Sequence, residues 1–226
     1  MEIQLSEGER RVLAKIAEAA QQLQFPCYLI GGFVRDKRLG RPTKDADIVC
    51  VGDGLLLAER AAALFSPKPV VSYFKTFGTA QFTLADGFQV EFVGARKESY
   101  LPHTRNPEVM PGTITDDQNR RDFTINALAI SLNAADFGTL VDPFGGLHDL
   151  EQKIIKTPLA PDITFSDDPL RMLRAIRFAA QLGFEISWPT LDAIKRNATR
   201  ISIISQERIT DELNKILLSA KPSVGF

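Results

Sequence analysis

The sequence predicts a mixed α/β domain followed by an all-helical domain. Over about residues 1–155, apolar runs of strand length alternate with segments of helical periodicity. After Pro158 and Pro161 the strand patterns stop and only helical patterns remain. Hydrophobic residues make up 44% of the chain and charged residues 24%, as is usual for a globular protein. We therefore expect an α/β domain at 1–155 and a helical domain at 156–226.

Composition limits the function classes. The net charge of the 226 residues is −1, so any contact with nucleic acid must come from local basic patches. No apolar run reaches the ~18 residues that a membrane span needs, and the N-terminus has no signal-peptide pattern. Cys27 and Cys50 each flank an apolar strand and are typical of buried residues in a reducing compartment. A cytoplasmic enzyme with no membrane segment is the expectation.

The first part of the chain opens with an amphipathic helix over 6–24, where Ser6 and Glu9 form a capping box and Pro26 stops the helix. Strands are expected at 27–30, 46–51, 70–74, 79–84 and 88–93, with helices at 33–39, 55–65 and 116–132. Residues 94–115 hold three prolines and little periodicity, which favours a mobile loop near the site.

The second part is predicted to hold three helices. The first spans 167–182, with Pro169 at its first helical position and Gly183 at its end. The others are expected at 189–197 and 207–219. The closing residues KPSVGF bring no further element, so we expect a fragment of a longer protein.

Two aspartates in the second predicted strand are the first candidate site residues. Asp45 and Asp47 are separated by one residue, so in a strand their side chains point to the same side, with Cα atoms about 6–7 Å apart. Two carboxylates so close repel unless a cation lies between them, and oxygen-only ligands suit Mg²⁺ or Mn²⁺. Upstream, Gly31 and Gly32 allow backbone N–H groups to approach a phosphate.

Arg35 and Glu91 extend this candidate site. Arg35 lies one turn from the glycines, and a guanidinium can bind phosphate through two parallel hydrogen bonds. Glu91 lies on a strand that the Asp86-Gly87 hairpin returns to the sheet, and is the candidate third carboxylate. Three carboxylates on neighbouring strands can form a two-metal site for phosphoryl transfer. A solvated strand end or hairpin surface is the alternative for these acids.

Two further groups suit a nucleotide. Arg121, Asp122 and Asn126 offer donors and an acceptor for ribose hydroxyls and a triphosphate, although a charged helix start would look similar. Asp168 and Arg171 are three residues apart on one predicted helix face and form either an intrahelical salt bridge or a planar pair that reads a base edge. A carboxylate beside a guanidinium would accept C or A and disfavour U or G.

Three arginines and one glutamate accompany this pair. Arg174 and Arg177 lie on later turns of the same helix and could reach phosphates or RNA. Arg208 and Glu212, four residues apart, are predicted to form a surface pair, with a brace behind the base-reading helix as the alternative.

Five motifs in this order resemble the class II nucleotidyltransferase superfamily, which holds the tRNA CCA-adding enzymes and the bacterial poly(A) polymerases. The resemblance covers about residues 25–220 and rests on segments GGFVRD (31–36), DAD (45–47), RRDFTINA (120–127), DPFGG (142–146) and DDPLR (167–171). Asp167 stands where the family has Glu, at a position that does not pair with the base.

The resemblance implies a head domain like that of DNA polymerase β, with a small mixed sheet, followed by a helical neck. It implies that Asp45 and Asp47 bind Mg²⁺, and that Asp168 and Arg171 read incoming CTP or ATP without a nucleic-acid template. The DPFGG turn would couple head and neck. Family members continue into body and tail domains that hold tRNA, and we expect these domains to be missing from this sequence.

The leading hypothesis is addition of C and A to the 3′ end of tRNA, with attack of the terminal hydroxyl on the α-phosphate. A poly(A) polymerase is the runner-up, but that branch tends to carry a basic stretch where this chain has YFKTFGTAQFTL (73–84). A CC-only or A-only enzyme is a further alternative. A non-catalytic RNA-binding module or a small-molecule nucleotidyltransferase would come from other classes.

Overall fold

The computed structural model describes residues 3–99 and 108–225, which form two compact units. The sheet unit consists of Met1–Lys97, Val109–Gln118 and Leu128–Pro143. The helical unit consists of Glu98–Glu108, Asn119–Ala127 and Phe144–Phe226. Asn119–Ala127, which lies between strands of the large sheet in sequence, thus packs with the helices, while the domain division at 155/156 stays a prediction. The mixed sheet followed by helices confirms the predicted fold class.

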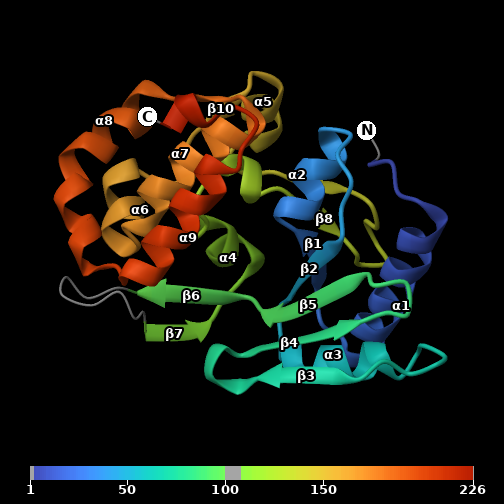
Figure 1. The fold of residues 1–226 in the computed structure, drawn as a ribbon. Helices are drawn as coiled ribbons and strands as arrows, with labels where there is room; N and C mark the ends of the chain where they lie inside the picture. Colours follow the sequence, from blue (N-terminus) through green and yellow to red (C-terminus); the bar gives the residue numbers. More distant parts are fainter. Residues whose placement is uncertain (1–2, 100–107, 226) are drawn as a thin grey trace. The chain divides into compact units, whose positions relative to one another are not determined.

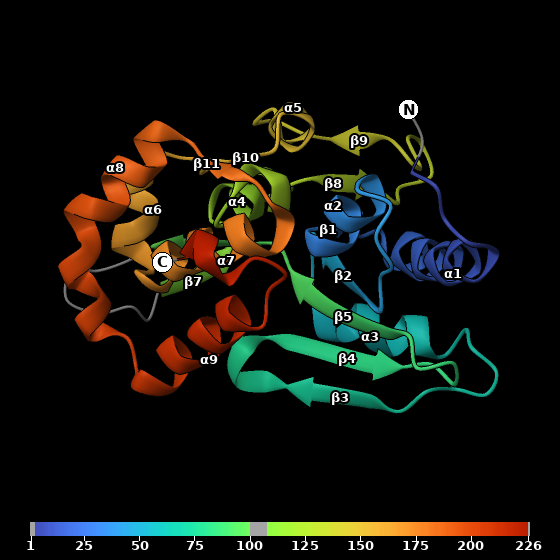
Figure 2. The ribbon, with the colours of Figure 1, turned by 45° about the horizontal axis from the view of Figure 1, so that its top comes forward.

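The sheet unit is built on a seven-stranded mixed sheet (Figure 1, Figure 2). In spatial order, its strands are β3 (Val71–Phe74), β4 (Thr79–Thr83), β5 (Gln89–Gly94), β2 (Asp45–Cys50), β1 (Cys27–Ile30), β8 (Ala129–Ser131) and β9 (Leu140–Val141). β2 runs parallel to β5 and antiparallel to β1. The strands expected at 27–30, 46–51, 70–74, 79–84 and 88–93 are therefore confirmed, within a residue or two.

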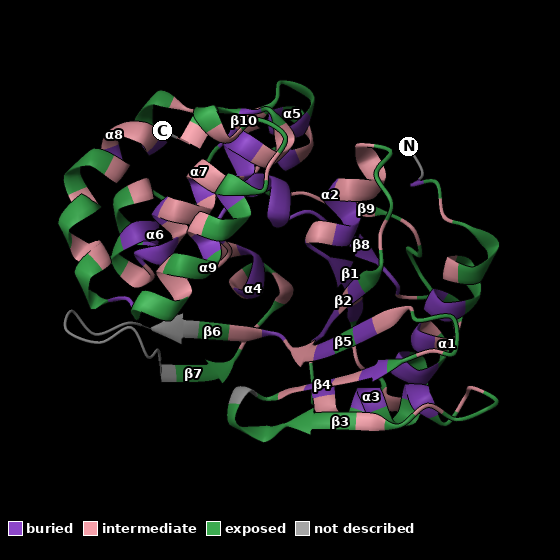
Figure 3. Ribbon diagram, viewed as in Figure 1, coloured by how far each residue is buried: buried purple, intermediate pink, exposed green. Residues whose placement is uncertain are grey.

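One face of the central strands is fully packed, and Figure 3 shows this burial along β2 and β5. Every second residue of β2, β4 and β5 is buried there, including Ile48, Phe82 and Phe92. Helix α3 (Gly54–Ala62) packs against β4 and β5, and α1 (Glu7–Leu23) packs against α3. Because side chains alternate along a strand, the residues between the buried ones lie on the opposite face.

The capping box predicted for α1 is present and has a second use. Ser6 Oγ accepts from the Glu9 backbone N–H, and the Glu9 carboxylate accepts from the Ser6 N–H. The same carboxylate lies 2.6 Å from Nζ of Lys37, on helix α2 (Gly32–Arg38), and accepts from Thr43 Oγ1 at 3.1 Å. The start of α1 therefore holds α2 and the loop that leads to β2.

Two expectations about the middle of the chain are wrong. The segment 94–115, expected to be a loop, contains β6 (Arg96–Ser99) and β7 (Glu108–Pro111), which form a two-stranded sheet. The helix expected at 116–132 is instead α4 (Ile114–Asn119), a 3-10 helix η2 (Thr124–Asn126) and strand β8. A short apolar run has no clear period, and pairing of β8 with β1 decides its conformation.

The helical unit contains five α-helices and a small parallel sheet within the described residues. Its elements are α5 (Gly146–Glu151), β10 (Ile154–Ile155), α6 (Pro161–Asp167), α7 (Leu170–Leu182), β11 (Glu185–Ile186), α8 (Trp188–Asn197) and α9 (Gln206–Leu217). Phe165, Met172 and Ala193 form a core cluster between α6, α7 and α8. None of the described helices has the length and apolarity needed to cross a membrane.

Three details of this unit differ from expectation. The helix predicted over 167–182 begins only at Leu170, because Asp168 is extended (φ −138°, ψ 101°) and separates α6 from α7. β11 is a strand beyond Pro161, stabilised by pairing with β10. The end of the chain, expected to be without structure, forms a 3-10 helix at Pro222–Gly225 that packs against α7 and α9.

Candidate active site

The three predicted carboxylates lie on one face of the sheet unit. Asp47 is the in-register partner of Glu91 across the parallel β2–β5 ladder. Directly opposite residues on neighbouring strands project to the same face, and so does Asp45, two residues before Asp47. Asp45 and Glu91 are exposed and Asp47 is partly buried. The fold thus brings together residues that are more than forty positions apart in sequence.

The glycine turn leaves the sheet beside these acids. Ile30, the last residue of β1, is the partner of Asp47, and Gly31 follows it. Gly31 has φ 83° and ψ −136°, a conformation that side chains disfavour, so glycine is required there. Its own N–H donates to the Leu128 carbonyl at 3.0 Å. Donors for a phosphate would therefore come from the first turn of α2, which starts at Gly32.

Arg35 lies over this turn. A Cβ added to Gly32 would be 3.6 Å from Nη2 of Arg35, so the guanidinium rests against the glycine. Asp36 accepts from Nε and Nη2 of Arg35 at 3.0 and 2.8 Å, and the Arg35 side chain is 11% exposed. A positive charge is therefore held next to the glycine turn.

The three acids offer the type of ligand that a divalent metal prefers, and the backbone places them on the same face of the sheet. Carboxylate oxygens are the ligands that Mg²⁺ and Mn²⁺ prefer, and Asp45, Asp47 and Glu91 share one face. Yet among the described residues no group of three or more His, Cys, Asp or Glu side chains is gathered closely enough to hold a metal ion. The three carboxylates share a surface, and their side chains do not converge on one point.

In the helical unit, Asp122 is the centre of a buried polar cluster. Its Oδ1 accepts from the Asn126 amide at 2.9 Å and from the Phe123 N–H at 2.8 Å. Its Oδ2 accepts from Nε and lies 2.6 Å from Nη2 of Arg174 on α7. Burial alone would raise the pKa of Asp122, but the Arg174 guanidinium and the Asn126 amide outweigh it and lower the pKa to about 2.

Arg121 joins the same loop, so the three residues expected to meet a nucleotide do lie together. Arg121 Nη1 lies 3.4 Å from the Asn126 carbonyl oxygen, which accepts its hydrogen bond. They do not lie on one continuous helix, as the helix expected over 116–132 would have them, because only 124–126 of this loop are helical. The link from Asp122 to Arg174 was not predicted, since no local spacing signals a contact between residues so far apart.

Asp168 and Arg171 are the predicted base readers, and each contacts other groups of the protein. They do not form the salt bridge with each other that was the alternative for this pair. Asp168 Oδ1 accepts from the Leu170 N–H at 3.1 Å, and its Oδ2 lies 3.4 Å from Nη2 of Arg208. Arg171 Nη2 donates to the Arg120 carbonyl at 2.7 Å. Both side chains are partly exposed, and these contacts hold them in place near the surface.

Arg208 and Glu212 contact different partners, so the surface pair expected between them is wrong. Arg208 contacts Asp168, and Glu212, only 3% exposed, lies 2.6 Å from Nε of Arg177. Arg177 also lies over the Phe178 ring, 4.1 Å from its centroid. Helix α9 therefore supports α7 from behind, the alternative considered for this pair. In the sequence, only the four-residue spacing of Arg208 and Glu212 indicated this role.

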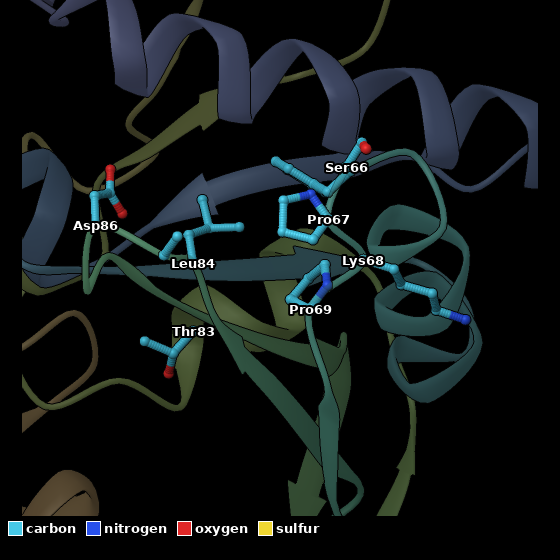
Figure 4. A pocket seen from close by; sticks show the side chains of 9 residues that line it. Ser66, Pro67, Lys68, Pro69, Thr83, Leu84 and Asp86 are labelled. Atoms are coloured by element: carbon cyan, nitrogen blue, oxygen red, sulfur yellow. The ribbon is translucent and has the colours of Figure 1, made fainter.

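A shallow cavity of about 460 Å³ lies elsewhere in the sheet unit (Figure 4). It is bounded by the segment after α3, with Ser66, Pro67 and Lys68, and by the end of β4 near Thr83 and Asp86. None of the predicted site residues lines it. The sheet face that carries Asp45, Asp47 and Glu91 is therefore a better candidate site than this cavity.

Comparison with characterised proteins points to tRNA-processing enzymes. The chain is 40% identical over 214 residues to an A-adding tRNA nucleotidyltransferase of Geobacter sulfurreducens, matching 93% of this chain and 24% of that protein. It is 38% identical over 222 residues to a CCA-adding enzyme of Pediococcus pentosaceus, matching 97% of this chain and 52% of that protein. The chain thus spans about a quarter to a half of the length of these relatives.

A solved structure gives the same picture. A tRNA nucleotidyltransferase crystallised with a primer tRNA and an incoming ATP analogue matches 93% of this chain and 58% of its own, with a TM-score of 0.80 and 34% identity.

Family sequence models match both parts of the chain. One described as a probable RNA and SrmB-binding site of polymerase A matches residues 183–226. One described as the poly A polymerase head domain matches residues 27–156, more than half of the chain. The resemblance seen in the sequence motifs is thereby confirmed, and the chain belongs to the poly A polymerase head domain family of nucleotidyltransferases.

Proposed function

We propose that this chain adds C and A from CTP and ATP to the 3′ end of tRNA. The observation that carries the proposal is the register of β2 and β5, which sets Glu91 beside Asp47 and next to the Gly31 turn. The relatives named CCA-adding and A-adding enzymes support the same reaction class. The 3′-hydroxyl of the RNA attacks the α-phosphate, and pyrophosphate leaves.

The residues of the sheet unit would perform the transfer. Asp45 and Asp47 would hold Mg²⁺ or Mn²⁺, and Glu91 would be the catalytic carboxylate beside them. When bound, the metal would supply positive charge for the phosphates and lower the pKa of the attacking hydroxyl. The first turn of α2 after Gly31 and the guanidinium of Arg35 would bind phosphate oxygens.

The helical unit would select the nucleotide. Asp168 can accept from the exocyclic amine of cytosine or adenine, and Arg171 can donate to the neighbouring ring acceptor. Arg121 and Asn126 would bind the ribose and triphosphate, with Arg174 and Arg177 as further phosphate ligands and Asp122 behind them. Since Asp122 already accepts from Arg174, its free capacity for a ribose hydroxyl is small, and its main effect would be to orient Arg174 and Asn126.

A-only addition is the second candidate, because an A-adding enzyme is 40% identical over 93% of this chain. The test incubates the 226-residue chain with Mg²⁺, each nucleotide in turn, and tRNA ending either in the discriminator base or in CC. Incorporation of C, C and A on the first tRNA supports CCA addition, whereas A on the second tRNA alone supports A-only addition. Long A tails on any RNA would indicate a poly(A) polymerase, and binding without transfer a non-catalytic module.

The matched variants are Asp45→Asn and Asp47→Asn against Glu59→Gln, an exposed acid on α3. The first two should lower the transfer rate by about 10³-fold, the scale seen when a transition-state contact is lost. Glu59→Gln should leave it unchanged. Full activity of Asp45→Asn would sink the assignment of the metal ligands.

A further inference from the structure

The sheet face that carries the three carboxylates also carries uncharged polar side chains on β5, β4 and β3. We call this side of β2, β5, β4 and β3 the open face. Two rows of in-register neighbours that begin at the β2 aspartates cross it: Asp47–Glu91–Gln81–Ser72 and Asp45–Gln89–Thr83. These side chains are partly or fully exposed, while the residues between them along β2, β4 and β5 are buried on the other face. Each acid of β2 thus has polar neighbours on the strands beside it.

Gln81 and Gln89 are fixed to each other within these rows. Nε2 of Gln89 donates to Oε1 of Gln81 at 2.7 Å, which links the two rows diagonally. Both side chains are partly buried, so the bond holds two otherwise flexible amides in place. It uses one N–H of Gln89 and one lone pair of Gln81. The Gln89 carbonyl remains as an acceptor and the Gln81 amino group as a donor.

The charge of this surface restricts what it can bind. Every charged residue within β2, β3, β4 and β5 is an acid on the open face, and these strands contain no Lys or Arg. A phosphate placed over the amides would be repelled by Glu91 and Asp45, their direct neighbours. An uncharged group with a donor beside an acceptor matches both the charge and the hydrogen-bonding groups. The edge of a nucleobase is such a group.

We propose that Gln81 and Gln89 bind the base of the 3′-terminal nucleotide of the RNA acceptor. This inference rests on the proposed function, in which the acceptor hydroxyl must reach the carboxylates. Gln89 lies one strand and Gln81 two strands away from the β2 aspartates. A base held by these amides keeps the ribose of the same nucleotide on the side of Asp45 and Asp47, while its phosphate lies outside the acidic rows. The two glutamines are then binding residues for the acceptor and not for the incoming nucleotide.

The test compares Gln81→Ala, Gln89→Ala and Gln21→Ala, an exposed glutamine on α1, in the 226-residue chain. The acceptor is a tRNA ending in its discriminator base, and a second acceptor has an abasic terminal nucleotide. On the normal acceptor, each open-face variant should raise the KM for RNA about tenfold, the effect of losing about one buried hydrogen bond. The KM values for CTP and ATP should stay within about twofold of wild type, as expected for a change of about 0.4 kcal/mol or less.

The abasic acceptor separates binding of the base from a structural role. With wild type and Gln21→Ala, removal of the terminal base should raise the KM for RNA about tenfold; with the open-face variants it should add less than about twofold. If the increases in the KM for RNA caused by the variant and by the abasic acceptor multiply, or if all three variants behave alike, the inference is overturned. Transfer by the wild-type chain would in that case still support the proposed function. A wild-type chain without transfer overturns the proposed function, and the inference falls with it.

Discussion

Arg174 and Asp122 are joined by two contacts to a single carboxylate oxygen, 2.8 Å from Nε and 2.6 Å from Nη2. The pair connects the loop before η2 with the middle of α7. Asp122 is 8% exposed at its side chain and Arg174 34%, so the carboxylate is deeply buried and the guanidinium reaches the surface. The same Arg174 lies 5.5 Å from the centroid of the Phe178 ring, which in turn packs edge-on against Phe123.

Asp122→Asn should destabilise the helical unit strongly. The substitution removes the charge that pairs with the Arg174 guanidinium. Loss of one member of a fully buried pair costs about 3 kcal/mol or more, and because the Arg174 side chain is 34% exposed we expect about 2 kcal/mol. Urea unfolding of the whole chain, followed by far-UV circular dichroism, measures the change. The matched control is Asp162→Asn, whose pair with Arg196 is about half exposed on both sides and should show no measurable effect. Equal stability of both variants would contradict the prediction.

The stability of the helical unit should depend on pH through the same carboxylate. Although burial favours the neutral form, the Arg174 guanidinium and the Asn126 amide hold the pKa of Asp122 at about 2 in the folded state, below its ordinary value of 3.8. A lowered folded pKa gives a contribution that is complete above about pH 4 and is lost as the pH falls towards 2. It amounts to about 2 kcal/mol. Unfolding measured from pH 5 to pH 2 should show this loss in wild type and a flatter profile in Asp122→Asn.

Gly31→Ala should destabilise the sheet unit and slow the transfer. At φ 83° and ψ −136° a Cβ is strained, so the variant should lose about 2 kcal/mol or shift the turn that begins α2. Thermal unfolding and the transfer assay together measure the two effects. Gly8→Ala is the control, because Gly8 lies inside α1 and a Cβ there meets only Ser6 Oγ, at 3.9 Å. That variant should be as stable as wild type or slightly more stable.

The two cysteines should be inert in the folded protein. Cys27 and Cys50 face each other across the β1–β2 ladder, and both are buried. Burial raises the pKa of both thiols, that of Cys50 to about 12, so the reactive thiolate is scarce at neutral pH. A thiol reagent such as DTNB at pH 8 should titrate neither cysteine until urea unfolds the chain, and then both. Rapid reaction of the folded protein would show that this part of the sheet opens readily.

The elements with strong local signals agree with the structure. The capping box of Ser6 and Glu9 marked the start of α1, and the Asp86-Gly87 turn marked the return of the chain into β5, which carries Glu91. The same strand contains Gln89, to which sequence reasoning assigned no role, because a lone glutamine suggests no chemistry. By contrast, the apolar run around Ala129 and Ile130 looked helical and is the strand β8, since its partner β1 lies about a hundred residues away in sequence.

The sequence by itself determined the chemistry available: an aspartate pair in a strand, a glycine turn before it, and Asp168 near Arg171 at the start of a helix. Local rules suffice for these because alternation, capping and glycine conformations depend on near neighbours. Only the tertiary structure decided that Glu91 stands beside Asp47 and that Arg174 neutralises Asp122. It also decided that Gln81 and Gln89 join on the open face. Strand register and buried ion pairs are set by packing between distant segments, which no local pattern encodes.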